Sequence, residues 1–205
     1  QTCYFERIIK KFHMEDAKTV KTPFAPHFKL TAAQSPADFH ELTEMKAVPY
    51  ANLVGSLMYG MVCSRPDLAH AMSVVSRYMS NPGRPHWEAS KWILRYVKGT
   101  SNKGLVFTKS DVEGDILTGF VDSDYAADLD KRRSLSGYIF TLFGNVVSWR
   151  STLQTVVALS STEAEYIALA ESVKEAVWLK GSVSAMYHGK CAVEIHCDSQ
   201  SALAL

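Results

Sequence analysis

The chain has 205 residues, of which 47% are hydrophobic and 21% are charged, a composition typical of a globular protein with one or two cores. It contains no run of about 18 apolar residues, which excludes an ordinary membrane-spanning helix, and no basic-then-apolar signal segment follows Gln1. The net charge of +1 excludes a strongly basic or strongly acidic protein. Because the chain starts at Gln1, we expect a piece of a longer protein that is not secreted.

The small net charge hides two unlike halves. Residues 1–110 hold 15 Lys and Arg against 8 Asp and Glu, a balance of +7, and residues 111–205 hold 7 against 13, a balance of −6. A cationic half beside an acidic half suits a protein that grips a polyanion with one part and holds divalent cations with the other. Two ordinary solvated surfaces would give the same counts, so charge alone leaves both interpretations open.

The four cysteines are scattered and form no Cys-x-x-Cys pair, which favours reduced thiols in an intracellular protein. A zinc site is conceivable on ligand type alone, because His188, Cys191, His196 and Cys197 lie close together in the sequence. Neighbouring residues of a strand point to opposite faces, so this stretch disfavours zinc.

The first half of the chain is predicted to be helical. Residues 1–20 predict a short amphipathic helix, and residues 21–48, with Pro23, Pro26 and Pro36, predict an extended connector. Apolar periodicity with Pro or Gly at the ends then predicts three helices, joined by short connections. They run from Pro49 to about Cys63, from Pro66 to the Asn81-Pro82-Gly83 stop, and from Pro85 to Lys98.

After Gly104 the apolar period changes from 3.6 to 2, which predicts a sheet. The fold class is therefore α/β (α+β): an N-terminal helical subdomain, residues 1–110, and a mixed sheet with packed helices, residues 111–205. The predicted elements are strands Ile116–Val121, Ser136–Leu142 and Val146–Trp149, a Gly144-Asn145 turn, a brief extended piece at 156–159, a helix Thr162–Ser184, a strand Val193–Cys197 and a helix start after Asp198.

Acidic residues stand at the ends of these predicted elements. Asp122 and Asp124 close the first strand on one face, Asp198 follows the last strand, and Glu165 lies in the first turn of the long helix. Clustered carboxylates repel one another and persist at low cost only when cations neutralise them. Hard oxygen ligands favour Mg²⁺ or Mn²⁺, and two such ions about 4 Å apart can promote phosphodiester hydrolysis.

Each acid also has an ordinary structural interpretation. Thr162 and Glu165 fit a helix capping box, in which Glu165 merely accepts a backbone hydrogen bond. Acidic side chains suit the positive end of a helix without any metal, and Asp122 and Asp124 suit a turn. Only the joint arrangement of the acids points to catalysis.

The sequence words around these acids are more specific. G-F-V-D-S-D-Y-A-A-D (119–128), R-R-S-L-S-G-Y (132–138), A-L-S-S-T-E-A-E-Y-I-A-L (158–169) and C-D-S-Q-S-A (197–202) resemble the ribonuclease H domain of copia-type retrotransposon polyproteins. The first half is similar to the end of the reverse transcriptase that precedes this domain. It carries V-P-Y-x-x-x-V-G-S-L-M-Y (48–59), R-P-D-L-A-H-A (65–71) and W-x-x-x-K-W-I-L-R-Y-V-K-G-T (87–100). The resemblance covers nearly the whole chain.

The resemblance implies that Asp122, Glu165 and Asp198 are catalytic ligands of two Mg²⁺ or Mn²⁺ ions, and that Asp124 is not a direct ligand. It implies an endonuclease that cuts the RNA strand of an RNA–DNA hybrid and leaves a 5′-phosphate and a 3′-hydroxyl. Such enzymes recognise 2′-hydroxyls and backbone shape. The implied partners are the hybrid and the rest of the polyprotein, with no membrane, and the implied location is a cytoplasmic particle or the nucleus.

Two departures from the family pattern bear on activity. The family's fourth acidic ligand lies beyond Leu205, so we expect an incomplete, C-terminally truncated domain. The aspartate pair of the polymerase palm is absent from these 205 residues, so the helical half corresponds to a thumb-like or connecting region.

Basic residues supply candidate contacts to nucleic acid. Arg132, Arg133 and Arg150 suit phosphates of the hybrid, although a solvated hairpin edge explains them equally well. Lys91 and Arg95, near Trp87 and Trp92, suit steering or stacking of nucleic acid, whereas core packing is the better explanation for Trp87.

The main rival to the nuclease is a catalytically silent module that binds nucleic acid or a partner chain. An integrase or transposase core, which shares an acidic triad, is disfavoured by the matched words.

Overall fold

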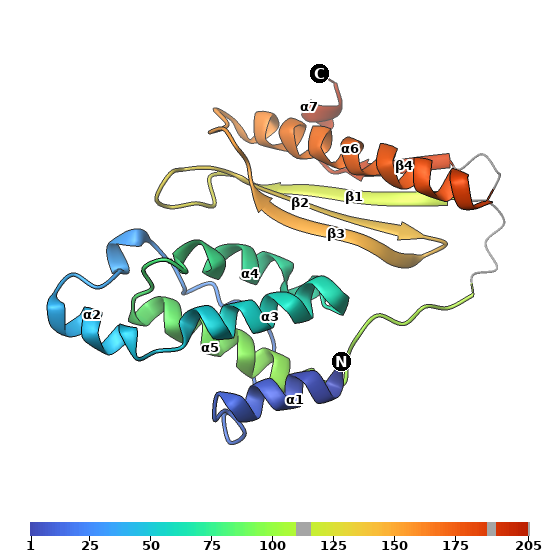
Figure 1. Cartoon of the computed structure of the whole chain (residues 1–205). Helices are drawn as coiled ribbons and strands as arrows, with labels where there is room; N and C mark the ends of the chain where they lie inside the picture. Colours follow the sequence, from blue (N-terminus) through green and yellow to red (C-terminus); the bar gives the residue numbers. More distant parts are fainter. Residues whose placement is uncertain (110–115, 188–191, 205) are drawn as a thin grey trace. The chain divides into compact units, whose positions relative to one another are not determined.

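The computed structural model describes residues 1–109, 116–187 and 192–204. The chain divides into two compact units, Gln1–Leu105 and Val106–Leu205, where the sequence placed a boundary near residue 110 (Figure 1). The first unit is helical and the second holds a mixed sheet, which confirms the predicted α/β class. None of the helices within the described ranges has the length and apolar character that a bilayer crossing requires.

The first unit is built from helices of moderate length and short helical turns. The long helices are α1 (Thr2–Lys11), α3 (Tyr50–Ser64) and α5 (Arg84–Gly99), with the shorter α2 (Phe39–Lys46) and α4 (Ala69–Val75) between them. Three 3-10 turns complete it: Ala32–Gln34, Pro66–Leu68 and Ser76–Tyr78.

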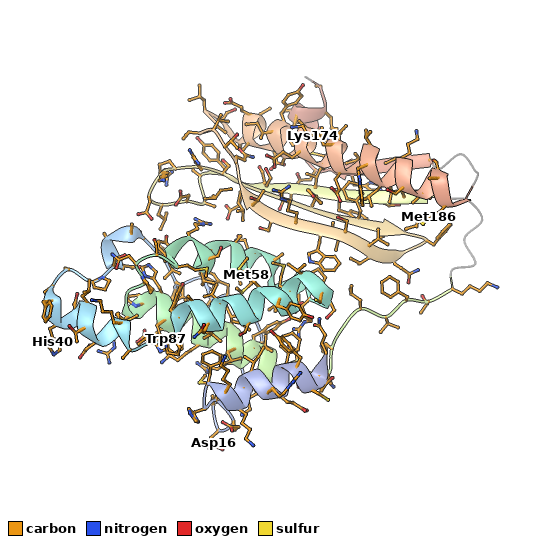
Figure 2. All side chains as sticks on the ribbon, viewed as in Figure 1. Asp16, His40, Met58, Trp87, Lys174 and Met186 are labelled. Carbon is orange, nitrogen blue, oxygen red and sulfur yellow. The ribbon has the colours of Figure 1, made fainter. Side chains whose placement is uncertain are left out.

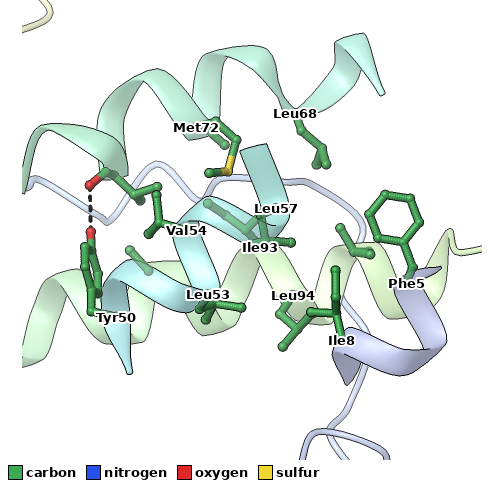
Figure 3. Close-up of a cluster of buried hydrophobic side chains, with 14 of the residues drawn as sticks. Phe5, Ile8, Tyr50, Leu53, Val54, Leu57, Leu68, Met72, Ile93 and Leu94 are labelled. Carbon is green, nitrogen blue, oxygen red and sulfur yellow. Dashed lines mark hydrogen bonds between the residues drawn. The ribbon is translucent and has the colours of Figure 1, made fainter. Parts of the chain in front are cut away.

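The apolar stripes of these helices meet in one core (Figure 3). Phe5 from α1, Leu57 from α3 and Ile93 from α5 are fully buried, and the Tyr50 hydroxyl donates a hydrogen bond of 2.7 Å to the carbonyl of Val75. Burying a large apolar side chain contributes about 1.5–3 kcal/mol, so this contiguous cluster is the main stabilising element of the unit.

Two predictions for this half needed correction. The expected extended connector at residues 21–48 contains α2, because Asp38 caps it by accepting a hydrogen bond from the Glu41 amide at 2.8 Å, and Glu41 in turn accepts one from Ala37. The helix expected from Pro66 is not continuous either, since 3-10 turns flank α4 on both sides. A short polar helix with a good cap has little apolar periodicity to reveal it.

A buried arginine, Arg65, joins the segment R-P-D (65–67) to the segment K-G-T (98–100) by hydrogen bonds. The Arg65 side chain is only 2% exposed; it donates to both carboxylate oxygens of Asp67 at 2.9 and 2.8 Å, and to the carbonyl and hydroxyl oxygens of Thr100. Asp67 also accepts a hydrogen bond of 2.8 Å from the Tyr96 hydroxyl. Burial acts to raise the pKa of Asp67, but the hydrogen bonds from Arg65 and Tyr96 outweigh it and hold that pKa below its usual value.

The second unit is a four-stranded mixed sheet in the order β3-β2-β1-β4. Strands β1 (Ile116–Asp124), β2 (Leu135–Leu142) and β3 (Asn145–Leu153) form an antiparallel meander, and β4 (Ala192–Cys197) joins β1 in parallel. A parallel neighbour requires a crossover, which the long helix α6 (Ser161–Tyr187) supplies before the short α7 (Gln200–Leu203).

Helix α6 packs along one face of this sheet (Figure 1). Its buried residues Ala176, Leu179 and Val183 contact Leu117 of β1 and Phe140 of β2. Gly119 lies opposite Phe140, and any side chain at Gly119 would collide with that ring, so this glycine lets the phenylalanine fill the core. Lys174 and Met186, also on α6, are exposed (Figure 2).

The strands and long helix lie where the sequence placed them, with two local differences. The hairpin turn is Phe143-Gly144, with φ of 51° and 76°, rather than Gly144-Asn145. Two left-handed residues give a turn whose twist matches that of the strands, and Asn145 begins β3 instead. Residues 156–159 form no strand and lead into α6.

The Arg65–Asp67 pair predicts how the first unit responds to mutation and acid. We expect Asp67→Asn to lower the free energy of unfolding of this unit by about 2 kcal/mol, since it leaves a buried guanidinium poorly paired; Asp67 is 37% exposed, which moderates the loss. Because the pKa of Asp67 is depressed in the folded state, its stabilisation is present above the ordinary value of 3.8 and disappears as pH falls through the lower folded value.

Calorimetric unfolding at pH 7 and in the acid range checks this expectation. Asp16→Asn, in the exposed loop after α1 (Figure 2), is the matched control and should change little. Equal stability of the Asp67→Asn and Asp16→Asn variants at pH 7 would show that the buried pair does not stabilise the unit.

Candidate functional site

The sheet register places the two strand-end aspartates side by side. Val121 of β1 pairs with Cys197, the last residue of β4, at the end of the parallel ladder; Asp122 is the next residue of β1, and Asp198 follows the end of β4. Both carboxylates are exposed, and Asp122 Oδ1 accepts a hydrogen bond of 2.9 Å from the Ser123 amide. The strand end is therefore acidic and open to solvent.

Glu165 is the fifth residue of α6, just past the first turn in which it was expected, and it is not the capping residue. Ser160 caps the helix by accepting a hydrogen bond from the Glu163 amide at 3.1 Å, and Glu163 accepts one from the Leu159 amide at 2.6 Å. The helix thus starts before the Thr162–Glu165 box considered from the sequence. This arrangement leaves the Glu165 carboxylate available for another role.

Two polar side chains that sequence reasoning missed hold Glu165 in place. The Ser123 hydroxyl donates a hydrogen bond of 2.8 Å to Glu165 Oε1, which joins β1 to α6. The fully buried Gln154 donates to the carbonyl of Ala164 at 2.8 Å and to the Ser136 hydroxyl at 3.1 Å, which fixes the start of α6 against the sheet. Strand alternation puts Ser123 on the same face of β1 as the buried Leu117, which α6 covers, and this alternation is the sequence signal that could have found it.

The electrostatics of the site centre on Glu165. Burial raises the pKa of its carboxyl above the usual value, the negative charges of Asp122 and Asp198 add to the rise, and the hydrogen bond from Ser123 opposes it. Glu165 Oε2 is shielded from solvent and has no hydrogen-bond partner among the described residues. A buried, unpaired carboxylate oxygen is costly unless a cation satisfies it.

Within the described part of the chain, one group of three potential metal ligands forms: Glu165, Cys197 and Asp198. Ligand atoms of these three side chains lie within 4.8 Å of one another. Asp122 does not belong to that group, although its charge acts on Glu165. The oxygen donors and the unpaired Oε2 fit a divalent cation, and Cys197 is a neighbour that the sequence did not assign to the site.

The alternative zinc set does not converge on this site as far as its members can be placed. His196 stacks on Phe120, with ring centroids 5.1 Å apart, and its Nε2 lies 3.7 Å from Glu194. By strand alternation His196 projects from the face opposite Cys197. His188 and Cys191 lie outside the described residues.

The three arginines considered for phosphate contacts lie on the second unit. Arg132 and Arg133 stand in the loop between β1 and β2; the Arg132 amide donates to the Asp128 carbonyl at 2.7 Å, and the Asp128 amide donates to the Arg133 carbonyl at 3.0 Å. Arg150 is exposed on β3 opposite Tyr138. The hydrogen bonds of the loop position the backbone of Arg132 and Arg133, and pairing with β2 positions the backbone of Arg150.

Lys91 and Arg95 belong to α5 of the first unit and lie over aromatic rings. The Lys91 ammonium is 5.8 Å from the Trp87 ring centroid, and the Arg95 guanidinium is 4.9 Å from that of Trp92. Trp92 further contacts the rings of His27 and Phe28. Lys91, Arg95 and Trp92 line an open pocket of about 380 Å³, together with Met14, His27, Phe28 and the acidic Glu88.

Comparison with known proteins identifies relatives along the whole chain. It is 50% identical over all 205 residues to the retrovirus-related Pol polyprotein from transposon TNT 1-94 of Nicotiana tabacum, of which it covers 15%. It is 37% identical over 180 residues, 87% of its length, to the Pol polyprotein from transposon RE2 of Arabidopsis thaliana, of which it covers 12%. Over 135 residues, 66% of its length, it is 53% identical to secreted RxLR effector protein 161 of Plasmopara viticola, and covers 94% of that protein.

The chain therefore spans a small part of the polyproteins that it matches. No family model matches it, and no solved structure does. The match to TNT 1-94 runs through both units, so the helical unit and the acidic sheet occur together in that relative. The chain belongs to the copia-type retrotransposon Pol polyproteins, as a fragment of one.

Proposed function

We propose that the second unit carries a metal-dependent nuclease site of the ribonuclease H type, which hydrolyses the RNA strand of an RNA–DNA hybrid. The observation that carries the proposal is the convergence of Asp122, Asp198 and Glu165, from β1, β4 and α6, at one end of the sheet. The three acids are remote in sequence, and nothing in the fold requires like charges to meet. Membership of the Pol polyprotein family supports a nucleic-acid substrate.

In this proposal the three carboxylates hold two Mg²⁺ or Mn²⁺ ions, because hard oxygen ligands suit these cations. When bound, such ions activate a water molecule and stabilise the leaving oxygen of a phosphodiester. Ser123 holds Glu165 through Oε1, which leaves Oε2 shielded from solvent and without a hydrogen-bond partner among the described residues. Gln154 fixes the helix start from which Glu165 projects.

The hybrid is held through its backbone in this proposal. Arg132, Arg133 and Arg150 of the second unit offer charged donors to its phosphates, and Lys91 and Arg95 offer a separate set on the first unit. Phosphate contacts position a duplex without reading its sequence, which matches an enzyme that recognises the shape of a hybrid. Binding of this kind weakens steeply as salt concentration rises.

A catalytically silent nucleic-acid-binding module is the second candidate, and one observation favours it. Asp122 lies outside the group of ligand atoms formed by Glu165, Cys197 and Asp198, so the triad does not close tightly around one point. Cleavage assays separate the two candidates.

The nuclease proposal predicts that the purified chain cuts labelled RNA–DNA hybrid only with Mg²⁺ or Mn²⁺. Asp122→Asn, Glu165→Gln and Asp198→Asn should each lower kcat/KM by about 100-fold or more, since losing one ligand removes roughly 3 kcal/mol of transition-state stabilisation. Asp124→Asn, two residues along the same strand, is the matched control and should retain activity within about tenfold. Hybrid that is bound but never cut, at any metal concentration, supports the silent module instead.

The Ser123 hydrogen bond predicts a change in pH dependence. It lowers the pKa of Glu165, so Ser123→Ala should raise that pKa further. A protonated Glu165 cannot bind a cation well, hence the acid limb of the pH–rate profile should move to higher pH in the variant. Activity at the alkaline plateau should be recovered largely in full. If the acid limb of the pH–rate profile does not move in the variant, Ser123 does not control the pKa of Glu165.

The raised pKa of Glu165 also predicts the stability of the metal-free chain. Because the pKa of Glu165 is raised in the folded state, protonation of this carboxyl stabilises the fold, and the whole contribution is present below the ordinary pKa of 4.5. The contribution is lost as pH rises through the pKa of the folded state. At pH 7 in EDTA, Glu165→Gln should therefore raise the melting temperature of the second unit, by about 2–4 °C. Mg²⁺ should stabilise the original chain more than the variant. Glu171→Gln on the same helix is the control, and an equal gain there would argue against charge repulsion at the site.

A further inference from the structure

Cys197 places a thiol inside the acidic cluster. Its Sγ and one carboxylate oxygen each from Glu165 and Asp198 lie within 4.8 Å of one another. Cys197 is half-buried and Asp198 is exposed, so a hydrated cation can approach from solvent. In the part of the chain that the structure describes, no other three residues gather in this way.

This donor set differs in chemistry from the three carboxylates alone. Thiolate is a soft ligand that favours Zn²⁺ and related ions, whereas Mg²⁺ favours oxygen donors only. Around one Zn²⁺, bonds of about 2.0–2.3 Å place the ligand atoms roughly 3–4 Å apart. Atoms already within 4.8 Å reach that spacing through small side-chain rotations.

A second feature belongs to the Glu165 carboxylate itself. Glu165 Oε2 is shielded from solvent and unpaired among the described residues, while Oε1 is taken by Ser123. The oxygen has no internal donor to satisfy it, and a bound cation would do so. Cys3 and Cys63, by contrast, are exposed thiols of the first unit, and no such group forms around them among residues 1–109, 116–187 and 192–204.

We propose that Cys197, Glu165 and Asp198 form a binding site for a thiophilic divalent cation, of which Zn²⁺ and Cd²⁺ are examples. Because two of its ligands are those proposed to hold Mg²⁺, the thiophilic ion competes with Mg²⁺ and inhibits the nuclease; this competition, unlike the binding itself, rests on the proposed function. Solvent supplies the remaining ligands at the exposed side of Asp198. Cys197 thus determines which cations the site accepts.

Cd²⁺ titration of the full chain in the absence of Mg²⁺ tests the site, followed by the ultraviolet charge-transfer band that only a thiolate–cadmium bond produces. A Cys3→Ser, Cys63→Ser, Cys191→Ser background leaves Cys197 as the only thiol. We expect a saturable band of one Cd²⁺ per chain in this background. Adding Cys197→Ser should abolish the band and lower the ratio of Cd²⁺ to Mg²⁺ affinity by about tenfold or more. Adding Glu165→Gln or Asp198→Asn should lower the Cd²⁺ affinity, read from the concentration that half-saturates the band, by about tenfold. Circular dichroism checks that each variant is folded.

Three results would overturn the proposal: no band in the background that retains Cys197, a band that persists after Cys197→Ser, or a band whose titration is unaffected by both carboxylate variants. Hybrid cleavage in Mg²⁺ is measured in parallel on the same proteins. Cleavage without the cadmium band disproves the thiophilic site and leaves the nuclease proposal standing. The band without cleavage supports the site and disproves the nuclease.

Discussion

The parallel pairing of β1 with β4 is the constraint on which the second unit depends. It brings Val121 opposite Cys197, and so makes neighbours of two aspartates that are 76 residues apart in the chain. Parallel strands cannot be joined by a tight turn, so the connection must cross over the sheet, and α6 serves as that connection. The crossover that allows the pairing also delivers Glu165, because the first turn of α6 starts at the same end of the sheet as the two strand ends. One topological requirement therefore accounts for where all three side chains lie, although it does not require any of them to be acidic.

Polar groups with no charge of their own secure that arrangement. Gln154 is fully buried and bridges β2 to the start of α6, and Ser123 links β1 to Glu165 itself. Fixed partners of this kind matter more at a site of like charges than elsewhere, since repulsion would otherwise turn the Glu165 side chain outward. The first unit instead uses an ion pair, in which the buried Arg65 is satisfied by Asp67 and by the oxygens of Thr100.

Much of this fold could be predicted from the sequence, because long elements with strong periodicity reveal themselves. The strands and α6 lie within a few residues of their expected positions, and the words V-D-S-D and C-D-S-Q marked the ends of the two strands that pair. Helix α2 was missed, since eight mostly polar residues rely on a cap rather than on an apolar stripe. The exact capping residue of α6 could not be settled either, because Ser160–Glu163 and Thr162–Glu165 fit the same pattern. Ser123 and Gln154 escaped notice because their importance comes from packing between elements distant in sequence, and Cys197 was considered only for the zinc set, not for the acidic cluster.

Strands β1 and β4 are neighbours in the sheet but lie far apart in the sequence, and this has a consequence for the order in which the unit can form. The meander of β1, β2 and β3 uses only local connections and can assemble while the rest of a nascent chain is still on the ribosome. Helix α6 and strand β4 come later in the chain, so the pairing of β1 with β4 is possible only after α6 has been synthesised. In a chain translated from its N-terminus, the acidic strand end is therefore complete only once residue 198 has been added, and shorter products carry the meander without the assembled cluster.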